Sequence, residues 1–344
     1  MTREEALLHY YDNYVNEALE KNKEKFLKTF EENKLWIKEI VISSTRKISE
    51  AVSAKQLDSS YDTMYINFSL LRTSVINKQY KVLISAYNRN WYLDEDPTHM
   101  TISFYPILSV VDELREYLEE KRKIYVNKIE NFHINEIVLK QVFEYFTHME
   151  LFVTTFLQDL DDERWFQSLN KTEEFFIRWG EYRDLTHIVY KFDKKEKNQS
   201  DFEKLIIQQQ ENDEELIFSS WQNLSFENIG CFEKNLMFSN FKRSTLENSE
   251  FIGSTLLGVN FKESKLLNCD FSRSLLDNAN FNNSTLEKVT FKNSILKNAD
   301  FTYVNLKEVD FEDCDLTGAK FLKKDIPFIG LSPWQLQTII IEEA

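Results

Sequence analysis

The hydrophobic pattern is most regular in the last third of the chain, where a large apolar residue recurs at every fifth position. From Phe241 to Phe321 these positions alternate Phe and Leu without interruption. They are Phe241, Leu246, Phe251, Leu256, Phe261, Leu266, Phe271, Leu276, Phe281, Leu286, Phe291, Leu296, Phe301, Leu306, Phe311, Leu316 and Phe321. A helix repeats every 3.6 residues and a strand every 2.0, so this period belongs to neither. The pattern predicts an internal repeat of five residues.

Small and turn-forming residues accompany the large ones at constant offsets. Two positions before each large residue stands Ser, Ala, Val or Cys, as at Ser244, Cys269 and Ala279. Asn and Gly recur two positions after it, and both tolerate unusual backbone angles. These positions are Asn248, Gly253, Gly258, Asn268, Asn278, Asn293, Asn298 and Gly318. We therefore expect a large and a small side chain to point inward and a turn to follow in each unit.

The repeat resembles the pentapeptide-repeat family, whose units hold a small residue, Asp or Asn, Leu or Phe, and two variable residues. The segments that carry the resemblance are Cys269-Asp270-Phe271, Ala279-Asn280-Phe281, Ala299-Asp300-Phe301 and Val309-Asp310-Phe311. The resemblance implies a right-handed quadrilateral parallel β-helix with four pentads in each coil. We place this solenoid at residues 221–326. Such a rod needs a cap at each end.

If one coil holds four pentads, residues 20 apart stack on the same face. On one Leu face, Thr255, Leu257, Leu275 and Ile295 then point outward and form an apolar patch. Exposed apolar patches mark contacts without naming them. Packing on the N-terminal domain of the same chain is the favoured explanation, and binding of a partner is the alternative. On a Phe face, Asn240, Asn260 and Asn280 are expected to form an amide ladder along the axis.

The repeat dissolves after Phe321, and a helical start signal follows. Ser332-Pro333 combines an N-cap residue with a first-turn proline. This predicts a capping helix in residues 327–344. Four apolar residues are expected to close the open end of the core: Trp334, Leu336, Ile339 and Ile340.

Helical spacing dominates the chain before the repeat, beginning with a capping box formed by Thr2 and Glu5. Helices are expected at residues 2–33, 34–56, 108–125, 135–160, 171–192 and 201–216. Residues 63–91 fit either a third helix or a pair of strands, because β-formers such as Tyr65 and Ile66 occur there. We predict an α+β multidomain protein, with a largely helical domain at residues 1–195 and a linker with a connecting helix at 196–220.

Charge and cysteine placement narrow the functional classes. The chain has 344 residues and a net charge of −15, but residues 221–325 contribute only −2 and residues 1–220 contribute −11. This disfavours direct nucleic-acid binding, because phosphates repel an acidic surface.

The three cysteines all fall on inward repeat positions, namely Cys231, Cys269 and Cys314, so neither a disulfide framework nor a metal site is expected. Without a signal peptide or an apolar span, we expect a soluble, cytoplasmic protein with no membrane contact.

Catalytic motifs and a cofactor fingerprint are both absent from the sequence. One polar–aromatic cluster is expected on a helix, with Asp184 able to share a side with Glu181 and His187. It comprises Arg178, Trp179, Glu181, Tyr182, Arg183, Asp184 and His187. An ion-pair network is favoured there over an active site. A second cluster at residues 87–92, which includes Trp91 and Tyr92, has rings that could stack on a nucleobase.

Three functional hypotheses follow from these patterns. The favoured one is a non-catalytic binding or scaffold protein that recognises a protein or peptide through the helical domain and a face of the solenoid. The family resemblance implies an alternative, a DNA mimic that protects DNA gyrase or topoisomerase IV from antibiotics or toxins. The third is an accessory factor in peptide maturation. The sequence leaves the oligomeric state open, a homodimer included.

Overall fold

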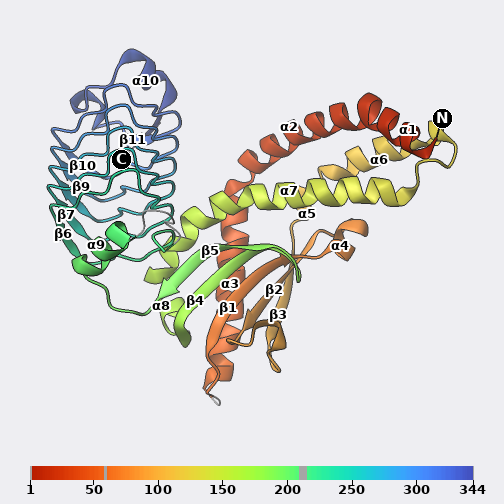
Figure 1. Cartoon of the computed structure of the whole chain (residues 1–344), viewed down its shortest axis with the longest axis horizontal. Coiled ribbons are helices and arrows are strands. Elements are labelled where there is room, and N and C mark those ends of the chain that lie inside the picture. The colour runs from red at the N-terminus through yellow and green to blue at the C-terminus, as the bar shows by residue number, and fades with distance from the viewer. Residues whose placement is uncertain (1, 58–59, 209–214, 344) are drawn as a thin grey trace. The chain divides into compact units, whose positions relative to one another are not determined.

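The computed structural model describes residues 2–57, 60–208 and 215–343. The chain forms two compact units, Met1–Lys191 and Phe192–Ala344. Both are drawn in Figure 1.

Long helices form one part of the N-terminal unit. They are α1 (Arg3–Tyr10), the π-helical turn η1 (Tyr11–Val15), α2 (Asn16–Glu32), α3 (Lys34–Gln56), α6 (Val111–Arg122) and α7 (Asn131–Leu157). Shorter elements are α4 (Arg72–Ile76), α5 (Tyr105–Leu108), α8 (Arg164–Gln167), η2 (Trp91–Leu93), η3 (Lys123–Tyr125) and η4 (Gln158–Asp162). The capping box of Thr2 and Glu5 is confirmed at the start of α1. The helices expected at residues 2–33, 34–56, 108–125 and 135–160 are confirmed to within a few residues.

A five-stranded sheet forms the other part of this unit, in the order β3-β2-β1-β4-β5. Its strands are β1 (Thr63–Leu70), β2 (Lys81–Tyr87), β3 (Thr98–Ser103), β4 (Lys171–Glu181) and β5 (Thr186–Asp193). Strands β1 and β2 are antiparallel, whereas β1 and β4 are parallel. Of the two interpretations left open for residues 63–91, the strand pair is therefore correct.

The helix predicted at residues 171–192 is wrong, because this segment forms β4 and β5. Phe175, Ile177 and Trp179 are buried at alternate positions, which is the period of a strand. Gly180, with φ +155°, lets the chain return closely, since a Cβ there would lie 2.3 Å from the carbonyl oxygen of Leu185. Hydrogen bonding of β4 to β1 therefore determined the structure of this segment, despite the helical spacing of its apolar residues.

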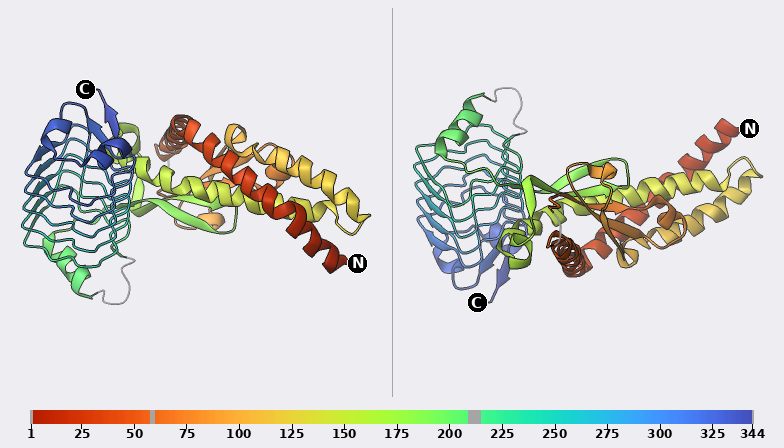
Figure 2. Two further views of the ribbon diagram at one scale, coloured as in Figure 1. Left: turned by 90° about the horizontal axis from the view of Figure 1, so that it is seen from above. Right: turned by 90° about the horizontal axis from the view of Figure 1, so that it is seen from below.

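The C-terminal unit is a solenoid of parallel strands (Figure 2). Its main sheet has the order β10-β9-β8-β7-β6. The strands are β6 (Ser225–Glu227), β7 (Thr245–Glu247), β8 (Lys265–Leu267), β9 (Thr285–Glu287) and β10 (Asn305–Lys307). Paired residues differ by 20 in number throughout, as in Leu246 with Leu266. The predicted 20-residue coil is confirmed.

Stacked side chains fill the solenoid core as the repeat predicts. Phe241 lies 5.3 Å from Phe261 between ring centroids, and Phe251 lies 5.1 Å from Phe271. All eight predicted Asn and Gly turn positions have positive φ, including Asn248 at 51°. The amide ladder is wrong, because the side-chain oxygens of Asn240, Asn260 and Asn280 accept backbone N–H groups two residues ahead in their own coil. The amide nitrogen of Asn260 has no partner in the described structure.

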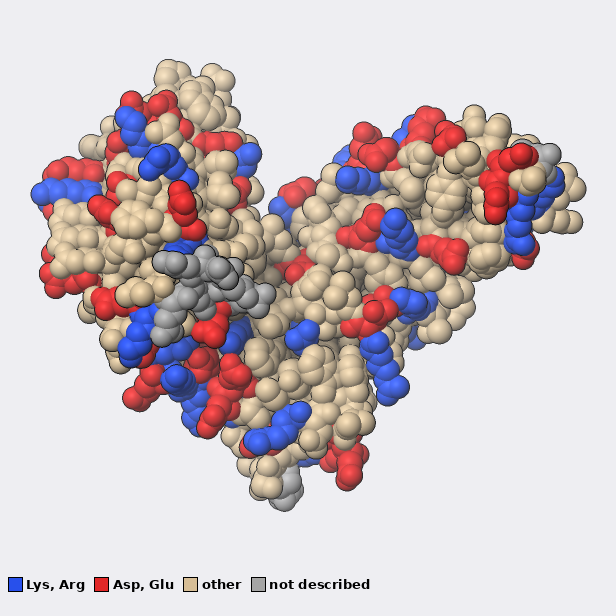
Figure 3. Space-filling model, viewed as in Figure 1, with Lys and Arg blue, Asp and Glu red and all other residues tan. Residues whose placement is uncertain are grey.

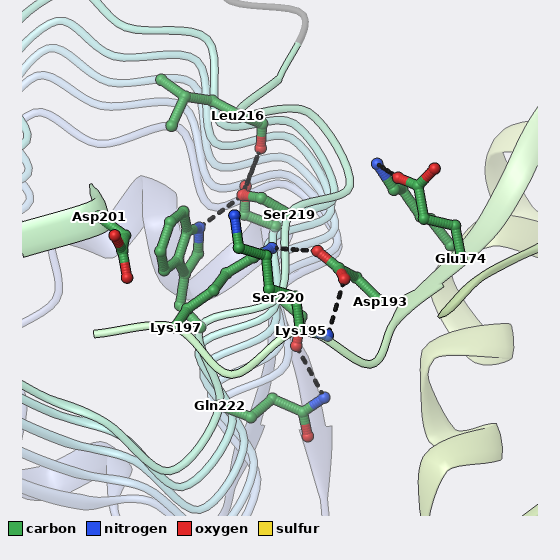
Figure 4. A network of polar contacts seen from close by, with 12 residues as sticks. Glu174, Asp193, Lys195, Lys197, Asp201, Leu216, Ser219, Ser220 and Gln222 are labelled. Atoms are coloured by element: carbon green, nitrogen blue, oxygen red, sulfur yellow. Dashed lines mark hydrogen bonds and ion pairs between the residues drawn. The ribbon is translucent and has the colours of Figure 1, made fainter. Parts of the chain in front are cut away.

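The N-terminal end of the solenoid is closed by helix α9 (Gln199–Gln208), which begins two residues before the predicted helix at 201–216 and overlaps its first half. Residues 209–214 of that prediction lie outside the described residues. Phe202 of α9 is fully buried and packs on Trp221, with ring centroids 4.8 Å apart. Lys197 pairs with Asp193 over 2.8 Å and lies 5.0 Å from the Trp221 ring (Figure 4). The Trp221 indole N–H donates to Ser219, so this end is fastened by apolar and polar contacts together.

The C-terminal end is closed by β11 (Lys320–Leu322), η5 (Ile326–Phe328), α10 (Pro333–Thr338) and β12 (Ile340–Glu342), which pairs with β11. Helix α10 begins at Ser332-Pro333 as predicted and has a capping box. The expectation that Trp334, Leu336 and Ile340 close the core is wrong, because these three are 39–49% exposed. Ile339 does pack against the core.

Candidate functional site

An outward row of apolar side chains runs along one face of the solenoid. Isolated β-bridges join Thr255 to Leu275 and Leu275 to Ile295, so the three residues follow each other in neighbouring coils. Strands in adjacent coils are about 4.8 Å apart, which makes this row continuous. Leu275 is 42% exposed, whereas Thr255 and Ile295 are half-buried. We call Thr255, Leu275 and Ile295, with the half-buried Leu257, the apolar row.

Polar residues limit the apolar row at both ends. The same series of bridges continues to Asn235 on one side and to Asp315 on the other. Asp315 pairs with Lys297 over 3.2 Å. On the same face burial raises the pKa of Asp277, which follows Leu276. The apolar surface is therefore three coils long and has a charged border.

A second outward row, on the face of Phe251 and Phe271, is acidic but interrupted. Bridges join Glu250, Asp270, Thr290 and Asp310 in series. The carboxylates of Asp270 and Asp310 each accept a backbone N–H two residues ahead, both over 2.8 Å. Elsewhere on the solenoid carboxylates pair with cations of an adjacent coil, as Glu263 does with Arg243 over 2.8 Å. In the face shown in Figure 3, acidic and basic side chains are intermixed over the solenoid.

The polar–aromatic cluster does not lie on a helix but spans β4, a turn and β5. Trp179 is fully buried, donates its indole N–H to the carbonyl of Phe146 over 2.7 Å and is part of the core. Glu181 and Asp184 both pair with Arg72. His187 contacts Glu150 instead, over 2.6 Å. The predicted proximity of Asp184 to His187 is therefore wrong. Residues three apart share one side of a helix, but here Asp184 lies in the turn and His187 lies in β5.

The two polar–aromatic segments nevertheless meet on one face of the sheet. The Arg178 guanidinium lies 4.8 Å from the Trp91 ring, and Trp91 lies 4.3 Å from Tyr65. Arg183 lies over Tyr92 and Tyr182 at 5.8 Å and 5.4 Å. Burial lowers the pKa of Arg178, whose guanidinium donates to Thr186.

Sequence reasoning missed Asn67, which belongs to this same sheet face. It is fully buried on β1, paired in register with Arg178 on β4. Neither its side-chain oxygen nor its side-chain nitrogen has a hydrogen-bond partner in the described structure. Only the register of β1 with β4 brings Asn67 beside Arg178, and no sequence signal joins residues so far apart.

Neither a metal-binding cluster nor a membrane-spanning helix is found among the described residues. Among residues 2–57, 60–208 and 215–343, no group of three or more His, Cys, Asp or Glu side chains is arranged to hold a metal ion. Of the helices in those same ranges, none is long and apolar enough to cross a membrane. The buried thiols of Cys269 and Cys314 have pKa values raised by burial to about 11 and about 12, so they are poor nucleophiles.

Residues 244–321 match the family model described as pentapeptide repeat region. This segment is a pentapeptide repeat region. The match begins after the whole N-terminal unit, so it assigns a family to the solenoid alone. No curated protein sequence matches the chain.

Solved pentapeptide repeat proteins resemble the chain only loosely. HetL from the cyanobacterium Nostoc, a protein involved in heterocyst differentiation regulation, is 17% identical over 37% of this chain and 67% of its own, with a TM-score of 0.21. A protein from the Arabidopsis thaliana thylakoid lumen is 18% identical over 35% and 70%, with a TM-score of 0.17. QnrB1, a plasmid-mediated fluoroquinolone resistance protein, is 12% identical over 38% and 88%, with a TM-score of 0.17. These likenesses carry no argument about function.

Inside the pentapeptide repeat region, several of the small residues also donate hydrogen bonds to the preceding coil. The hydroxyls of Ser254, Ser274 and Ser294 donate to the carbonyls of Cys231, Phe251 and Phe271, each 23 residues earlier. The thiol of Cys314 does the same to Phe291 over 2.8 Å. These hydrogen bonds tie each coil to the preceding one, and they explain why Ser is so frequent at this position of the repeat.

Proposed function

We propose that this chain is a non-catalytic binding protein in which the apolar row of the solenoid binds a protein partner. The observation that supports this most directly is the exposure of Leu275 between Thr255 and Ile295 on a regular surface. Apolar side chains held at fixed spacing favour a partner that offers an apolar strip of matching length. The repeat supplies rigidity, so little ordering cost opposes binding.

We further propose that the solenoid is the right-handed quadrilateral β-helix of the pentapeptide-repeat family. In that geometry the apolar row is the centre of one flat side. The N-terminal unit, with its half-buried sheet-face aromatics, is proposed to contribute a second recognition surface.

The experiment is an affinity capture from the native host's cytosol with the full chain as bait. A double variant, Leu275→Asp with Ile295→Asp, is expected to lose the specific partner while keeping the far-UV circular dichroism spectrum. Thr285→Asp is the matched control, because Thr285 occupies the corresponding outward position on another face. Equal capture by all three proteins would refute the proposed role of the apolar row.

The protection of DNA gyrase or topoisomerase IV by DNA mimicry is the second candidate. The register of Glu250, Asp270 and Asp310 favours it, since mimicry of a polyanion needs aligned negative charge. Thr290 and the neighbouring ion pairs weaken that field. Recovery of gyrase or topoisomerase subunits that persists in the Leu275→Asp, Ile295→Asp variant and is lost on Asp270→Asn with Asp310→Asn would establish this alternative.

A further inference from the structure

The connection between β2 and β3, residues 88–97, lies across one face of the five-stranded sheet. Trp91 of this connection packs on Tyr65 of β1, with ring centroids 4.3 Å apart. Tyr92, the next residue, packs on Tyr87 of β2, with ring centroids 5.4 Å apart. Two consecutive aromatic rings therefore rest on two neighbouring strands. We call residues 88–97 the covering loop.

Asn67 of β1 lies on the sheet face under the covering loop. Side chains of a strand alternate between its two faces, and Phe68 faces the aromatic core of the unit. Asn67 and Tyr65 therefore point to the opposite face. Arg178 of β4, in register with Asn67, points the same way, and its guanidinium lies 4.8 Å from the Trp91 ring.

Four polar atoms in this region are buried and have no hydrogen-bond partner within the described residues. They are the side-chain oxygen and nitrogen of Asn67, the indole nitrogen of Trp91 and the hydroxyl oxygen of Tyr92. Asn67 as a whole is fully buried. Buried polar groups are nearly always hydrogen-bonded, so each exception needs a physical explanation.

The polar side chains in register with Asn67 are already engaged elsewhere. Ser85, opposite Asn67 on β2, has its hydroxyl 2.8 Å from Nδ1 of His99. Arg178, opposite Asn67 on β4, donates to the hydroxyl and to the carbonyl of Thr186 over 2.9 Å and 2.7 Å. The Asn67 amide therefore keeps a donor and an acceptor side by side, both available to a further molecule.

The covering loop is strained at the residue that packs on Tyr65. Trp91 has φ +54°, in the left-handed region that is unfavourable for a bulky side chain. Asp94 fixes the loop, because its carboxylate accepts the hydroxyl of Tyr61 over 2.5 Å and the backbone N–H of Asn88 over 2.7 Å. Strain that the surrounding structure enforces in this way is concentrated at ligand clamps and switch regions.

We propose that the covering loop and the sheet face bind a small planar heteroaromatic molecule with an amide-like edge, which is the chemistry of a nucleobase. Asparagine reads the edge of adenine through the same pair of amide donor and acceptor that Asn67 leaves unpaired. Aromatic side chains stack on the faces of nucleobases, and Trp91 and Tyr65 are placed to hold a base between them. All four unpaired atoms belong to uncharged groups, so an uncharged edge satisfies them. This inference concerns the N-terminal unit alone and is independent of the apolar row.

Binding requires the Trp91 ring to move, because it now contacts Tyr65 directly. A base between the two rings separates them and restores stacking on both of its faces. Departure of Trp91 from the left-handed conformation relieves backbone strain, which lowers the cost of opening the covering loop. The environment of the Trp91 indole is therefore a direct reporter of binding.

The test is isothermal titration calorimetry of the full chain with adenosine, guanosine, cytidine and uridine as separate probes at millimolar concentration. At least one nucleoside is expected to bind. Asn67→Leu keeps a side chain of similar size and removes both unpaired atoms, so it should fold and should raise the Kd about tenfold. Trp91→Ala removes a stacking surface and should raise the Kd by about the same factor.

Two control variants match these changes away from the covering loop. Ser49→Ala removes a buried hydroxyl in α3 that likewise has no partner in the part of the chain that the structure describes. Trp165→Ala removes a half-buried indole in α8. Both should bind the nucleoside like the wild type. No heat with any of the four probes, or equal losses of affinity in loop and control variants, would overturn the proposal.

A second measurement uses the wild-type sequence and so does not depend on how the variants fold. Fluorine NMR of the chain labelled with 5-fluorotryptophan resolves the individual indoles, and the Trp91 signal is the one missing in Trp91→Phe. That signal should shift on addition of the nucleoside that binds. A shift confined to other tryptophans would overturn the proposal, as would an unchanged spectrum, since a buried water would then account for the Asn67 amide.

Discussion

The side-chain amide of Gln335 donates a hydrogen bond to the backbone carbonyl of Phe311 over 2.9 Å. In the coils before it, a Ser or Cys 23 residues further on fills this role, and Cys314 serves Phe291. The residue 23 positions after Phe311 is Trp334, which cannot do so in the same way. Gln335 in α10 substitutes for the missing coil and also reaches the carbonyl of Cys314 over 3.1 Å.

Replacing Gln335 by Leu should destabilise the C-terminal cap. The side chain is only 3% exposed, and its loss leaves the buried carbonyl of Cys314 without this donor, while the carbonyl of Phe311 keeps the backbone N–H of Cys314. Leaving buried polar groups unsatisfied costs about 1–3 kcal/mol. The midpoint of unfolding in guanidinium chloride, followed by circular dichroism, should fall accordingly. Gln337→Leu, at an exposed position of the same helix, is the control; an equal fall in both variants would contradict the capping role.

Two serines at equivalent repeat positions should respond differently to Ala substitution. The Ser274 hydroxyl donates to Phe251 over 2.6 Å, whereas the buried Ser284 hydroxyl has no partner in the described structure. Ser274→Ala should lower the free energy of unfolding by about 1 kcal/mol, and Ser284→Ala should be neutral or stabilising. Chemical denaturation of the two variants side by side measures this difference. A larger loss at Ser284 would show that its hydroxyl is engaged after all.

Alanine substitutions at Gly258 and Gly330 distinguish the effect of backbone strain from that of a steric clash. Both have positive φ, at +62° and +63°, so Ala is strained by about 1 kcal/mol at either site. A Cβ at Gly258 would lie 2.6 Å from the ring of Phe238, while a Cβ at Gly330 would meet nothing within 4 Å. Because the Phe238 ring is stacked on Phe218, Gly258→Ala should cost roughly 1–2 kcal/mol more than Gly330→Ala. Thermal unfolding of both variants tests this, and equal melting temperatures would exclude the clash.

Lys171 should make stability rise with pH in mildly alkaline solution. Burial lowers its pKa from the ordinary 10.5 to about 8. Between these values the unfolded chain binds more protons than the folded one, so the free energy of unfolding increases as pH rises from about 8 toward 10. Lys171→Met should be more stable than wild type below pH 8 and lose the advantage above it. A constant difference between the two proteins across this range would contradict the shifted pKa.

The repeat alone was sufficient to predict the pentapeptide repeat region. A large apolar residue stands at every fifth position from Phe241 onward, and the paired backbone residues are 20 apart, so sequence separation predicts which residues lie side by side. The stacking of Phe241 on Phe261 and the positive φ of Asn248 followed directly. The in-register order of Thr255, Leu275 and Ile295 followed for the same reason, while their role as a binding surface stays a prediction.

The tertiary structure decided what lies outside that local rule. Residues 171–192 have helical spacing but form β4 and β5, because β4 pairs with β1 and β5 with β4, and this sheet buries Trp179. The same pairing brought Arg178 to Trp91 and Asn67, and it separated Asp184 from His187. At the end of the solenoid, Gln335 rather than Trp334 is the residue whose side chain reaches the carbonyls of Phe311 and Cys314. The repeat in the sequence therefore predicts the stacking within the solenoid. The strand pairing of the N-terminal unit and the C-terminal cap depend on hydrogen bonds between residues that no local pattern connects.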